Sequence, residues 1–159
     1  MFFNIGQFMG QMLEFTNLNK NSIEICKDGI AKEVWYYDNG NVKQTGTYLY
    51  GKKYGKWVEY YSNKAKKSVK FYDEVGNPSG KWTTYYPNGE KWNASMYTNG
   101  KLNGVWVYWY SNGKKWHQLT YAEGELNGKW NFWDNQGKLN GKGIYKSLST
   151  DNSGIAAAY

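Results

Sequence analysis

The feature that most constrains this chain is a unit of 24 or 25 residues that recurs five times along it. The units start at Glu33, Trp57, Trp82, Trp106 and Trp130. A tyrosine stands fifteen residues after each start, and a glycine stands two residues before each of the last four. Such a period is typical of proteins in which copies of one small motif stack on their neighbours. The chain is therefore expected to form one row of similar elements.

Each unit has the pattern of a β-hairpin. An aromatic run comes first, an Asn-Gly pair or a variant of it follows, and a second run ends at the recurring tyrosine. Asn-Gly supplies the positive φ angles of a two-residue turn, so we expect such a turn in each unit. A second, glycine-rich connection, as at 51–55 and 100–104, then leads to the next unit. The sequence predicts an all-β fold, an elongated single-layer antiparallel meander of about ten strands built from five hairpins.

The repeats divide the chain into three parts. In 1–32, apolar residues at helical spacing between Phe2 and Leu13 predict a short N-terminal helix or cap. This helix is expected to pack on the first repeat or on a partner rather than on a membrane, because the first lysine is Lys20. The third part, 147–159, is a C-terminal tail of mostly small and polar residues. Between them, 33–146 holds the five repeats, at 33–56, 57–81, 82–105, 106–129 and 130–146.

Large amphipathic rings carry most of the apolar weight of the chain. Aromatic residues make up 19% of it, with 9 Trp and 16 Tyr. Alternation along a strand places the first residue of a unit on one face and the residue three places later on the other. Both faces are thus predicted to be aromatic and held together by cross-strand ring pairs. The candidate partner-binding residues are Trp57, Tyr60, Trp82, Tyr85, Trp106, Trp109, Trp116 and Trp133.

The charge balance favours diffuse attraction to acidic partners over specific recognition of an anion. The net charge is +7, and all 20 basic residues are lysines. Lysines at turns and edges also keep a sheet soluble, which is the plainest explanation of them. As a partner we expect a protein or a multi-subunit assembly first. An anionic lipid surface is the lesser alternative, and nucleic acid is not favoured.

The residues that enzymes use are too few and too scattered for catalysis. His117 is the only histidine and Cys26 the only cysteine, which leaves no catalytic triad and no zinc ligand set. The acidic pairs, at 73–74 and at 123 and 125, fall in turns, where solvated charge is normal. The glycine-rich turns open no helix and so do not resemble phosphate loops. The sequence predicts a protein that is not an enzyme and takes no cofactor, no metal and no small-molecule substrate.

The sequence shows no pattern of a signal peptide, a transmembrane helix or a disulfide. A single cysteine excludes an intramolecular disulfide. The apolar N-terminal stretch lacks the basic region and the cleavage site of a signal peptide. No run approaches the roughly 18 apolar residues of a transmembrane helix. We expect the protein in the cytoplasm or within an intracellular or virion assembly.

The repeats resemble the MORN-repeat proteins, and most of all the bacterial antitoxin-like variant of that family. Its pattern Tyr-Tyr-x-Asn-Gly stands at 85–89, and Tyr-x-x-Gly-x-x-x-Gly-x-Trp stands at 97–106 and again at 121–130. The second unit departs from the pattern, with Lys64 in place of the turn glycine and an extra residue before Gly76, where we expect a bulge. The last unit has Asp134 in place of the second ring, as expected of a terminal repeat.

The resemblance implies a sheet used for attachment and brings no catalysis with it. Members of the family act as scaffolds, as lipid-binding or membrane-proximal modules, and as antitoxin or immunity-like proteins. On this basis we expect a non-enzymatic protein-binding or scaffolding module, as a structural subunit of a larger assembly. The alternatives are an antitoxin that sequesters a toxin, and binding to a membrane surface or a cell-wall ligand. Choline-type cell-wall repeats also pair such rings, but their units are shorter, and cation binding beside so many lysines is unfavourable.

Overall fold

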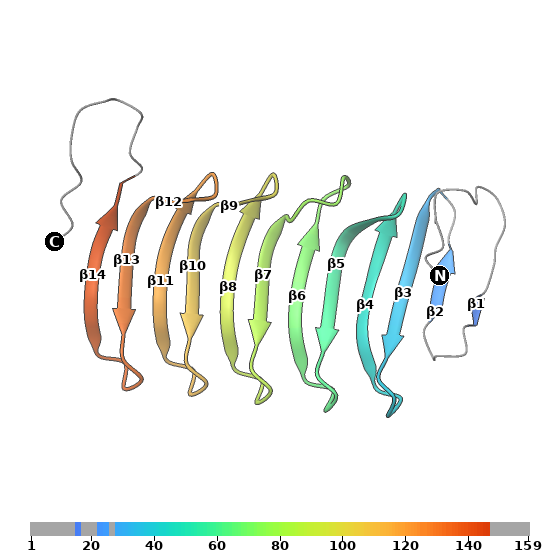
Figure 1. The fold of residues 1–159 in the computed structure, drawn as a ribbon, viewed down its shortest axis with the longest axis horizontal. Coiled ribbons are helices and arrows are strands. Elements are labelled where there is room, and N and C mark those ends of the chain that lie inside the picture. The colour runs from blue at the N-terminus through green and yellow to red at the C-terminus, as the bar shows by residue number, and fades with distance from the viewer. Residues whose placement is uncertain (1–14, 17–21, 26–27, 147–159) are drawn as a thin grey trace.

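A computed structural model describes residues 15–16, 22–25 and 28–146 of the chain. In this part the chain forms one antiparallel sheet, a single layer in which the strands lie side by side in chain order, and no helix (Figure 1). The predicted all-β meander is confirmed. The predicted helix between Phe2 and Leu13 lies outside the described residues.

Five hairpins form the body of the sheet, as the repeat predicts. They are β3 (Ile30–Tyr36) with β4 (Val42–Leu49), β5 (Lys52–Tyr60) with β6 (Lys66–Tyr72), β7 (Gly80–Tyr85) with β8 (Lys91–Thr98), β10 (Gly104–Trp109) with β11 (Lys115–Ala122), and β13 (Gly128–Trp133) with β14 (Leu139–Tyr145). The short strands β9 (Lys101–Leu102) and β12 (Glu125–Leu126) lie in the connections between hairpins. The sheet begins before the first repeat, because β1 (Phe15–Thr16) pairs with β2 (Ser22–Ile25), which pairs with β3.

The turns within the hairpins contain three residues, so the prediction of two-residue turns there is wrong. In the first hairpin, Gly40 N–H donates to Tyr37 O and Tyr37 N–H donates to Asn41 O, both at 2.8 Å. Of the three loop residues, only Gly40 has a positive φ, of 81°. This is a type I turn followed by a left-handed glycine, a geometry that Asn-Gly also allows. The same two hydrogen bonds recur in the other four hairpins.

The two-residue turns lie instead in the connections between hairpins. Leu49 pairs with Lys52 and Thr98 pairs with Lys101, so only two residues separate these strands. Both residues have positive φ at 50–51, 99–100 and 123–124, as type I′ turns require. The second unit differs, since Asp73 N–H donates to Asn77 O at 3.0 Å across a three-residue turn. The extra residue before Gly76, where we expected a bulge, is thus accommodated by a longer turn.

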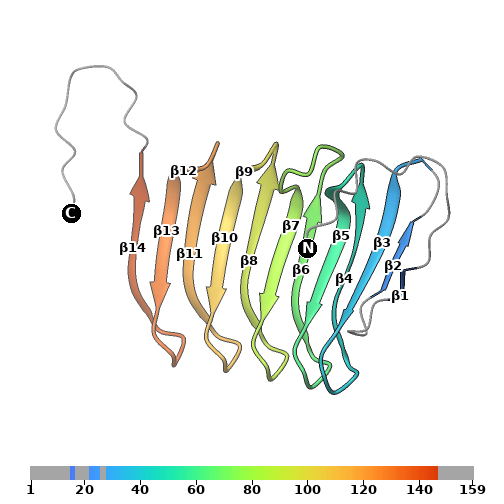
Figure 2. The ribbon, with the colours of Figure 1, turned by 45° about the vertical axis from the view of Figure 1, so that its right-hand side comes forward.

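A β-bulge occurs at the same place in every hairpin. Tyr108 pairs with His117 and Trp109 pairs with Lys115, so Trp116 has no residue opposite it. The equivalent residues in the other hairpins are Lys43, Lys67, Trp92 and Asn140. Because bulges bend a strand and increase its twist, their regular placement explains why the strands bend together, as Figures 1 and 2 show.

Tyrosine hydroxyls link each hairpin to the next. Neighbouring hairpins share few ladder pairs; β8 and β10, for example, pair only at Ala94 with Val107 and at Asn93 with Tyr108. Beyond these pairs, the fifth residue of a unit donates its hydroxyl hydrogen to a backbone carbonyl of the following unit. The four bonds are Tyr37 to Tyr60 (2.7 Å), Tyr61 to Tyr85 (2.7 Å), Tyr86 to Trp109 (2.8 Å) and Tyr110 to Trp133 (3.0 Å).

The turn asparagines add a second link, and the last hairpin lacks both links. Asn88 Oδ1 accepts from Glu90 N–H within its own turn, while Nδ2 donates to Ser111 O of the next turn at 2.8 Å. The last unit has Asp134 and Gln136 at the tyrosine and asparagine positions. The Asp134 carboxylate accepts from backbone N–H groups of its own turn and offers no donor to a further hairpin. The last described hairpin therefore carries neither of the two side chains that make these links in the other units.

Replacing Lys64 with glycine should raise the free energy of unfolding. Lys64 occupies the turn position with φ of 70°, where other hairpins have glycine. Relief of this strain should stabilise Lys64→Gly by about 0.5–1 kcal/mol, as measured by urea unfolding. Gly89→Lys is the reverse control, because Gly89 has φ of 89° and no atom within 4 Å of an added Cβ. A lower free energy of unfolding for Lys64→Gly would contradict the claim that Lys64 is strained in this turn.

Removing one linking hydroxyl should destabilise the sheet. Tyr86→Phe leaves the Trp109 carbonyl without its donor and should lower the free energy of unfolding by about 1 kcal/mol. The matched control is Tyr50→Phe, since the Tyr50 side chain is 71% exposed, and we expect a change within about 0.5 kcal/mol. Equal effects of the two variants in urea unfolding would show that the hydroxyl link contributes nothing.

Candidate functional site

Alternation along the strands sorts the aromatic residues onto two faces. We call one the tryptophan face; it carries Trp57, Trp82, Trp106 and Trp130 with Tyr48, Tyr72, Tyr97, Tyr121 and Tyr145. We call the other the lysine face; it carries Tyr60, Tyr85, Trp109 and Trp133 with Lys66, Lys91 and Lys115. The two faces use their rings differently, and this difference identifies the candidate site.

Rings on the tryptophan face pack against one another. Tyr48 and Trp57 lie 4.9 Å apart between ring centroids, Trp57 and Tyr72 6.4 Å, Tyr72 and Trp82 5.2 Å, and Trp82 and Tyr97 4.6 Å. Trp57 is only 2% exposed and lies over Gly46, where any side chain would collide with the indole. Its Nε1 donates to Thr47 O at 3.0 Å. Trp57 is therefore part of the core, which this thin sheet builds on its own surface.

His117 continues the ring packing toward the C-terminal end of the sheet. Its ring centroid lies 4.4 Å from that of Trp116 and 4.9 Å from that of Phe132. Burial among these rings lowers the pKa of His117. The histidine thus serves as a neutral packed ring, and the bulge places Trp116 on the tryptophan face beside it.

Glu33 occupies the position that tryptophan holds in the other units. It is 3% exposed and pairs with Gly46 across the strands. Burial raises the pKa of its carboxyl group, and hydrogen bonding by Tyr48 and the charge of Lys53 offset this only in part. The same lysine lies over the ring row, with its Nζ 4.3 Å from the Trp57 ring centroid.

The lysine face carries a row of alternating rings and ammonium groups. Each of three rings lies directly opposite a lysine of its own hairpin: Tyr60 opposite Lys66, Tyr85 opposite Lys91, and Trp109 opposite Lys115. Two of these lysines reach the ring of the next hairpin. Lys91 Nζ lies 5.7 Å from the Trp109 centroid, and Lys115 Nζ lies 5.5 Å from that of Trp133. We call Tyr60, Lys66, Tyr85, Lys91, Trp109, Lys115 and Trp133 the lysine row.

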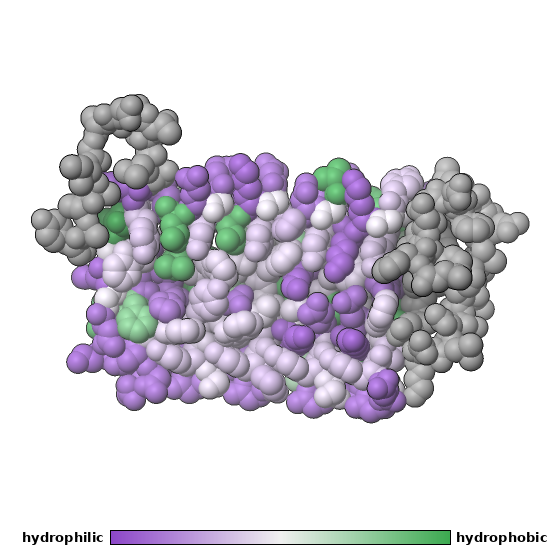
Figure 3. Space-filling model, viewed as in Figure 1, coloured by the Kyte–Doolittle hydropathy of each residue, from purple (hydrophilic) through white to green (hydrophobic). Residues whose placement is uncertain are grey.

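Two further rows complete the lysine face. A middle row of small, mostly buried side chains contains Val58, Thr83 and Ala94. The row at the other end of the strands is exposed and mixes apolar side chains with lysines: Lys56, Phe71, Lys81, Met96, Val105, Lys129 and Ile144. This face is therefore a broad aromatic, apolar and basic surface. Figure 3 shows one of the two faces of the sheet, on which hydrophobic residues form separate spots among pale and polar ones.

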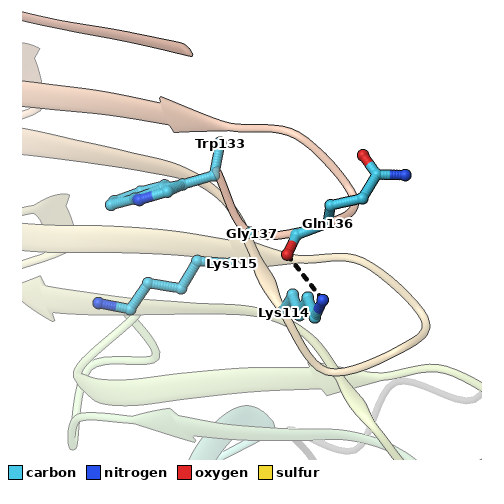
Figure 4. A pocket seen from close by; sticks show the side chains of 5 residues that line it. All are labelled: Lys114, Lys115, Trp133, Gln136 and Gly137. Atoms are coloured by element: carbon cyan, nitrogen blue, oxygen red, sulfur yellow. Dashed lines mark hydrogen bonds between the residues drawn. The ribbon is translucent and has the colours of Figure 1, made fainter. Parts of the chain in front are cut away.

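A hollow of about 400 Å³ lies at the C-terminal end of the lysine row. Figure 4 shows the Trp133 indole and the Lys115 side chain beside each other there. Lys114 Nζ donates to Gln136 O at 2.7 Å, so this ammonium group is tied to the neighbouring turn. Lys115 Nζ donates to Gln118 Oε1 at 3.3 Å, and it is the ammonium group that lies over the Trp133 ring.

The described part of the chain shows no group of three or more His, Cys, Asp or Glu side chains arranged to hold a metal ion. In the same part, no helix is long and apolar enough to cross a membrane. Neither finding adds a site to the lysine face.

The structure divides the eight predicted partner-binding residues equally between the faces. Trp57, Trp82, Trp106 and Trp116 lie on the tryptophan face, whereas the lysine face holds Tyr60, Tyr85, Trp109 and Trp133. That these residues bind a partner stays a prediction. Sequence reasoning assigned such lysines to turns and edges and named none of the row as a candidate. A signal was nevertheless present, since Lys66, Lys91 and Lys115 each stand two residues after the left-handed turn residue.

The stability contribution of Glu33 should depend on pH in a way that Glu33→Gln abolishes. Burial raises the folded-state pKa of Glu33 above its ordinary value of 4.5, so the folded protein holds this proton more tightly than the unfolded chain does. Stability is then lost as the pH rises from about 4.5 through the folded pKa. Relative to the wild type, Glu33→Gln should gain free energy of unfolding across this window and keep the gain at pH 7. A difference that stays constant from pH 4 to pH 8 in urea unfolding would refute the burial argument.

Comparison with known proteins gives a family pattern for three of the hairpins. The profile described as the MORN repeat variant matches residues 29–50, 78–99 and 102–123, in agreement with the resemblance read from the sequence. No curated protein sequence matches the chain.

Two solved structures align with the sheet. One is the crystal structure of accessory secretory protein 1, 2 and 3 in Streptococcus pneumoniae, with TM-score 0.37, 14% identity, and coverage of 80% of this chain and 23% of that one. The other is the GtfA/B complex bound to UDP and GlcNAc, with TM-score 0.35, 15% identity, and coverage of 90% and 28%. The chain thus spans about a quarter of the length of each, and at these scores neither likeness bears on function.

Proposed function

We propose that this chain, which carries repeats of the MORN variant type, is a non-enzymatic module that binds another protein through its lysine face. The observation that carries the proposal is the different use of rings on the two faces. On the tryptophan face the rings pack on one another, whereas Tyr60, Tyr85, Trp109 and Trp133 make no ring–ring contact with any other described residue. These rings are only partly buried, and Trp109 and Trp133 contact lysine ammonium groups rather than other rings, so their exposed surface can contact a partner.

The breadth of the lysine face favours a protein over a small molecule. Small-molecule sites are concave and enclose most of their ligand. Here the exposed apolar side chains, among them Phe71, Met96 and Ile144, spread over many strands beside the lysine row. Protein interfaces are enriched in Trp, Tyr, Phe and Met in this way, with charged residues at the rim. An extended, repetitive face also suits a scaffold, because each hairpin can contribute a similar contact to a long partner.

The scaffold role and the antitoxin role differ in stoichiometry rather than in the surface used. A scaffold or structural subunit binds within an assembly of several chains. An antitoxin or immunity-like protein holds one toxin in a one-to-one complex. We favour the scaffold, because the rings and lysines of the row recur from hairpin to hairpin instead of converging on one spot.

The proposal predicts that partner capture depends on the lysine face. Trp109→Ala with Trp133→Ala should reduce recovery of stoichiometric partners from the native source by about tenfold or more, since buried Trp side chains dominate interfaces. The matched control, Trp35→Ala with Trp92→Ala, removes two exposed indoles and leaves the lysine row intact. Affinity purification with quantitative mass spectrometry checks this, and urea unfolding confirms that both variants fold.

Each outcome of the capture experiment has a clear meaning. Loss of the same proteins in the Trp109 and Trp133 variant but not in the control supports the proposal, and several co-purifying subunits then favour a scaffold over an antitoxin. One small stoichiometric protein favours the antitoxin. Equal capture by both variants contradicts the proposal that this face binds partners.

A further inference from the structure

We propose that the lysine row binds an acidic, proline-rich segment of a partner in the polyproline II conformation, with three residues of the segment to each hairpin. This inference rests on the proposed function, because it assigns a partner chemistry to the same face. It starts from the repetition of the row: from Tyr60 to Lys115, each hairpin contributes one ring and one lysine directly opposite it.

The spacing of the row matches the repeat of a polyproline II helix. Equivalent residues of successive hairpins lie two strands apart, which is about 9.6 Å at about 4.8 Å per strand. Polyproline II has three residues per turn and a rise of 3.1 Å, which gives about 9.3 Å per turn. A segment that crosses the strands would therefore present the same side-chain position to each hairpin in turn.

A fully extended segment does not share this property. Its side chains alternate between two sides, so every third residue points alternately toward and away from the sheet. The sheet also offers no backbone partners on its faces, because the N–H and C=O groups of a strand point within the sheet toward the neighbouring strands. Polyproline II has no internal hydrogen bonds and keeps its backbone solvated, so it can lie on such a face without strand pairing.

The chemistry of the row matches proline and carboxylate side chains. Polyproline II segments are recognised by aromatic-lined surfaces, on which proline rings lie against Trp and Tyr. Lys66, Lys91 and Lys115 are exposed, and the row itself contains no acidic residue, so a carboxylate at every third position would meet one ammonium group per hairpin. The exposed end of Lys115 beside the Trp133 ring, at the hollow in Figure 4, provides such a position.

The lysines also set the length of the segment. The residue opposite the ring is Val42 in the first hairpin and Leu139 in the last, so the cations are confined to the three central hairpins. Four rings with three lysines between them span three hairpin repeats. At three residues per repeat, the segment that fills the row has about 9–12 residues.

Synthetic peptides test the inference on the intact protein. The probe is (Pro-Pro-Glu)₄, titrated while tryptophan fluorescence and binding heat are followed. Two controls separate register from charge. (Pro-Pro-Gln)₄ has the same conformation without charge, and (Pro-Glu)₆ has six carboxylates, of which only two fall on any one line of every third residue. The proposal predicts that (Pro-Pro-Glu)₄ binds about tenfold or more tightly than either. The proposal is overturned if (Pro-Glu)₆ binds as tightly as (Pro-Pro-Glu)₄. It is also overturned if a dodecamer of deoxythymidylate binds more tightly than (Pro-Pro-Glu)₄.

Charge variants locate the binding on the lysine row. Lys66→Gln with Lys91→Gln and Lys115→Gln should weaken (Pro-Pro-Glu)₄ binding by about tenfold or more. The matched control, Lys56→Gln with Lys81→Gln and Lys129→Gln, removes the same charge from the same face at the other end of the strands. Its effect should stay within about threefold, and an equal loss in both variants would overturn the proposal.

The failure of this inference is distinguishable from failure of the proposed function. If (Pro-Pro-Glu)₄ does not bind while Trp109→Ala with Trp133→Ala still abolishes partner capture, the partner chemistry is wrong and the binding face stands. If partner capture survives that double substitution, the binding face itself is wrong.

Discussion

Cross-strand packing of aromatic rings is the interaction on which the rest of this structure depends. A sheet ordinarily buries one face against a second layer, but the described part of this chain forms no second layer. Tyr and Trp rings on the tryptophan face instead cover their own backbone, and Gly46 shows how closely the Trp57 indole approaches it. Ring pairs contribute roughly 0.5–1.5 kcal/mol each beyond the area they bury, and the pairs recur from hairpin to hairpin. Because the rings that pack on one another lie along one face, the rings of the other face are left for a different use.

The second constraint is that successive hairpins must be held together where the ladder of hydrogen bonds between them ends. Tyrosine hydroxyls and asparagine amides make these links, and each link joins residues 23 or 24 positions apart in the chain. Contacts therefore connect mainly neighbouring units, as in other repeat proteins. In the last described hairpin, Asp134 takes the place of the linking tyrosine and accepts hydrogen bonds within its own turn. Neighbouring hairpins in this sheet are therefore held together by side-chain hydrogen bonds between repeats as well as by the backbone ladders.

The sequence allowed the period, the hairpins and the two aromatic faces to be predicted, because repetition and alternation act through spacing alone. It did not allow the turn lengths to be predicted. Asn-Gly fits both a two-residue turn and a type I turn with a left-handed glycine, and the choice depends on which residues pair across the turn, as Tyr37 does with Asn41. The resulting bulge places Trp116 on the tryptophan face. A rule of strict alternation along the strand does not predict this, because it does not allow for a bulge. The lysine row was overlooked because lysines near turns have an ordinary explanation in solubility.

The division of labour between the faces is the central claim, and fluorine NMR of protein labelled with fluorotryptophan tests it most directly. Titration with the partner captured from the native source should shift or broaden the resonances of Trp109 and Trp133. The resonances of Trp57, Trp82 and Trp106, whose rings are held in the packing of the tryptophan face, should stay in place. The account would be contradicted if the tryptophan face responded while Trp109 and Trp133 did not.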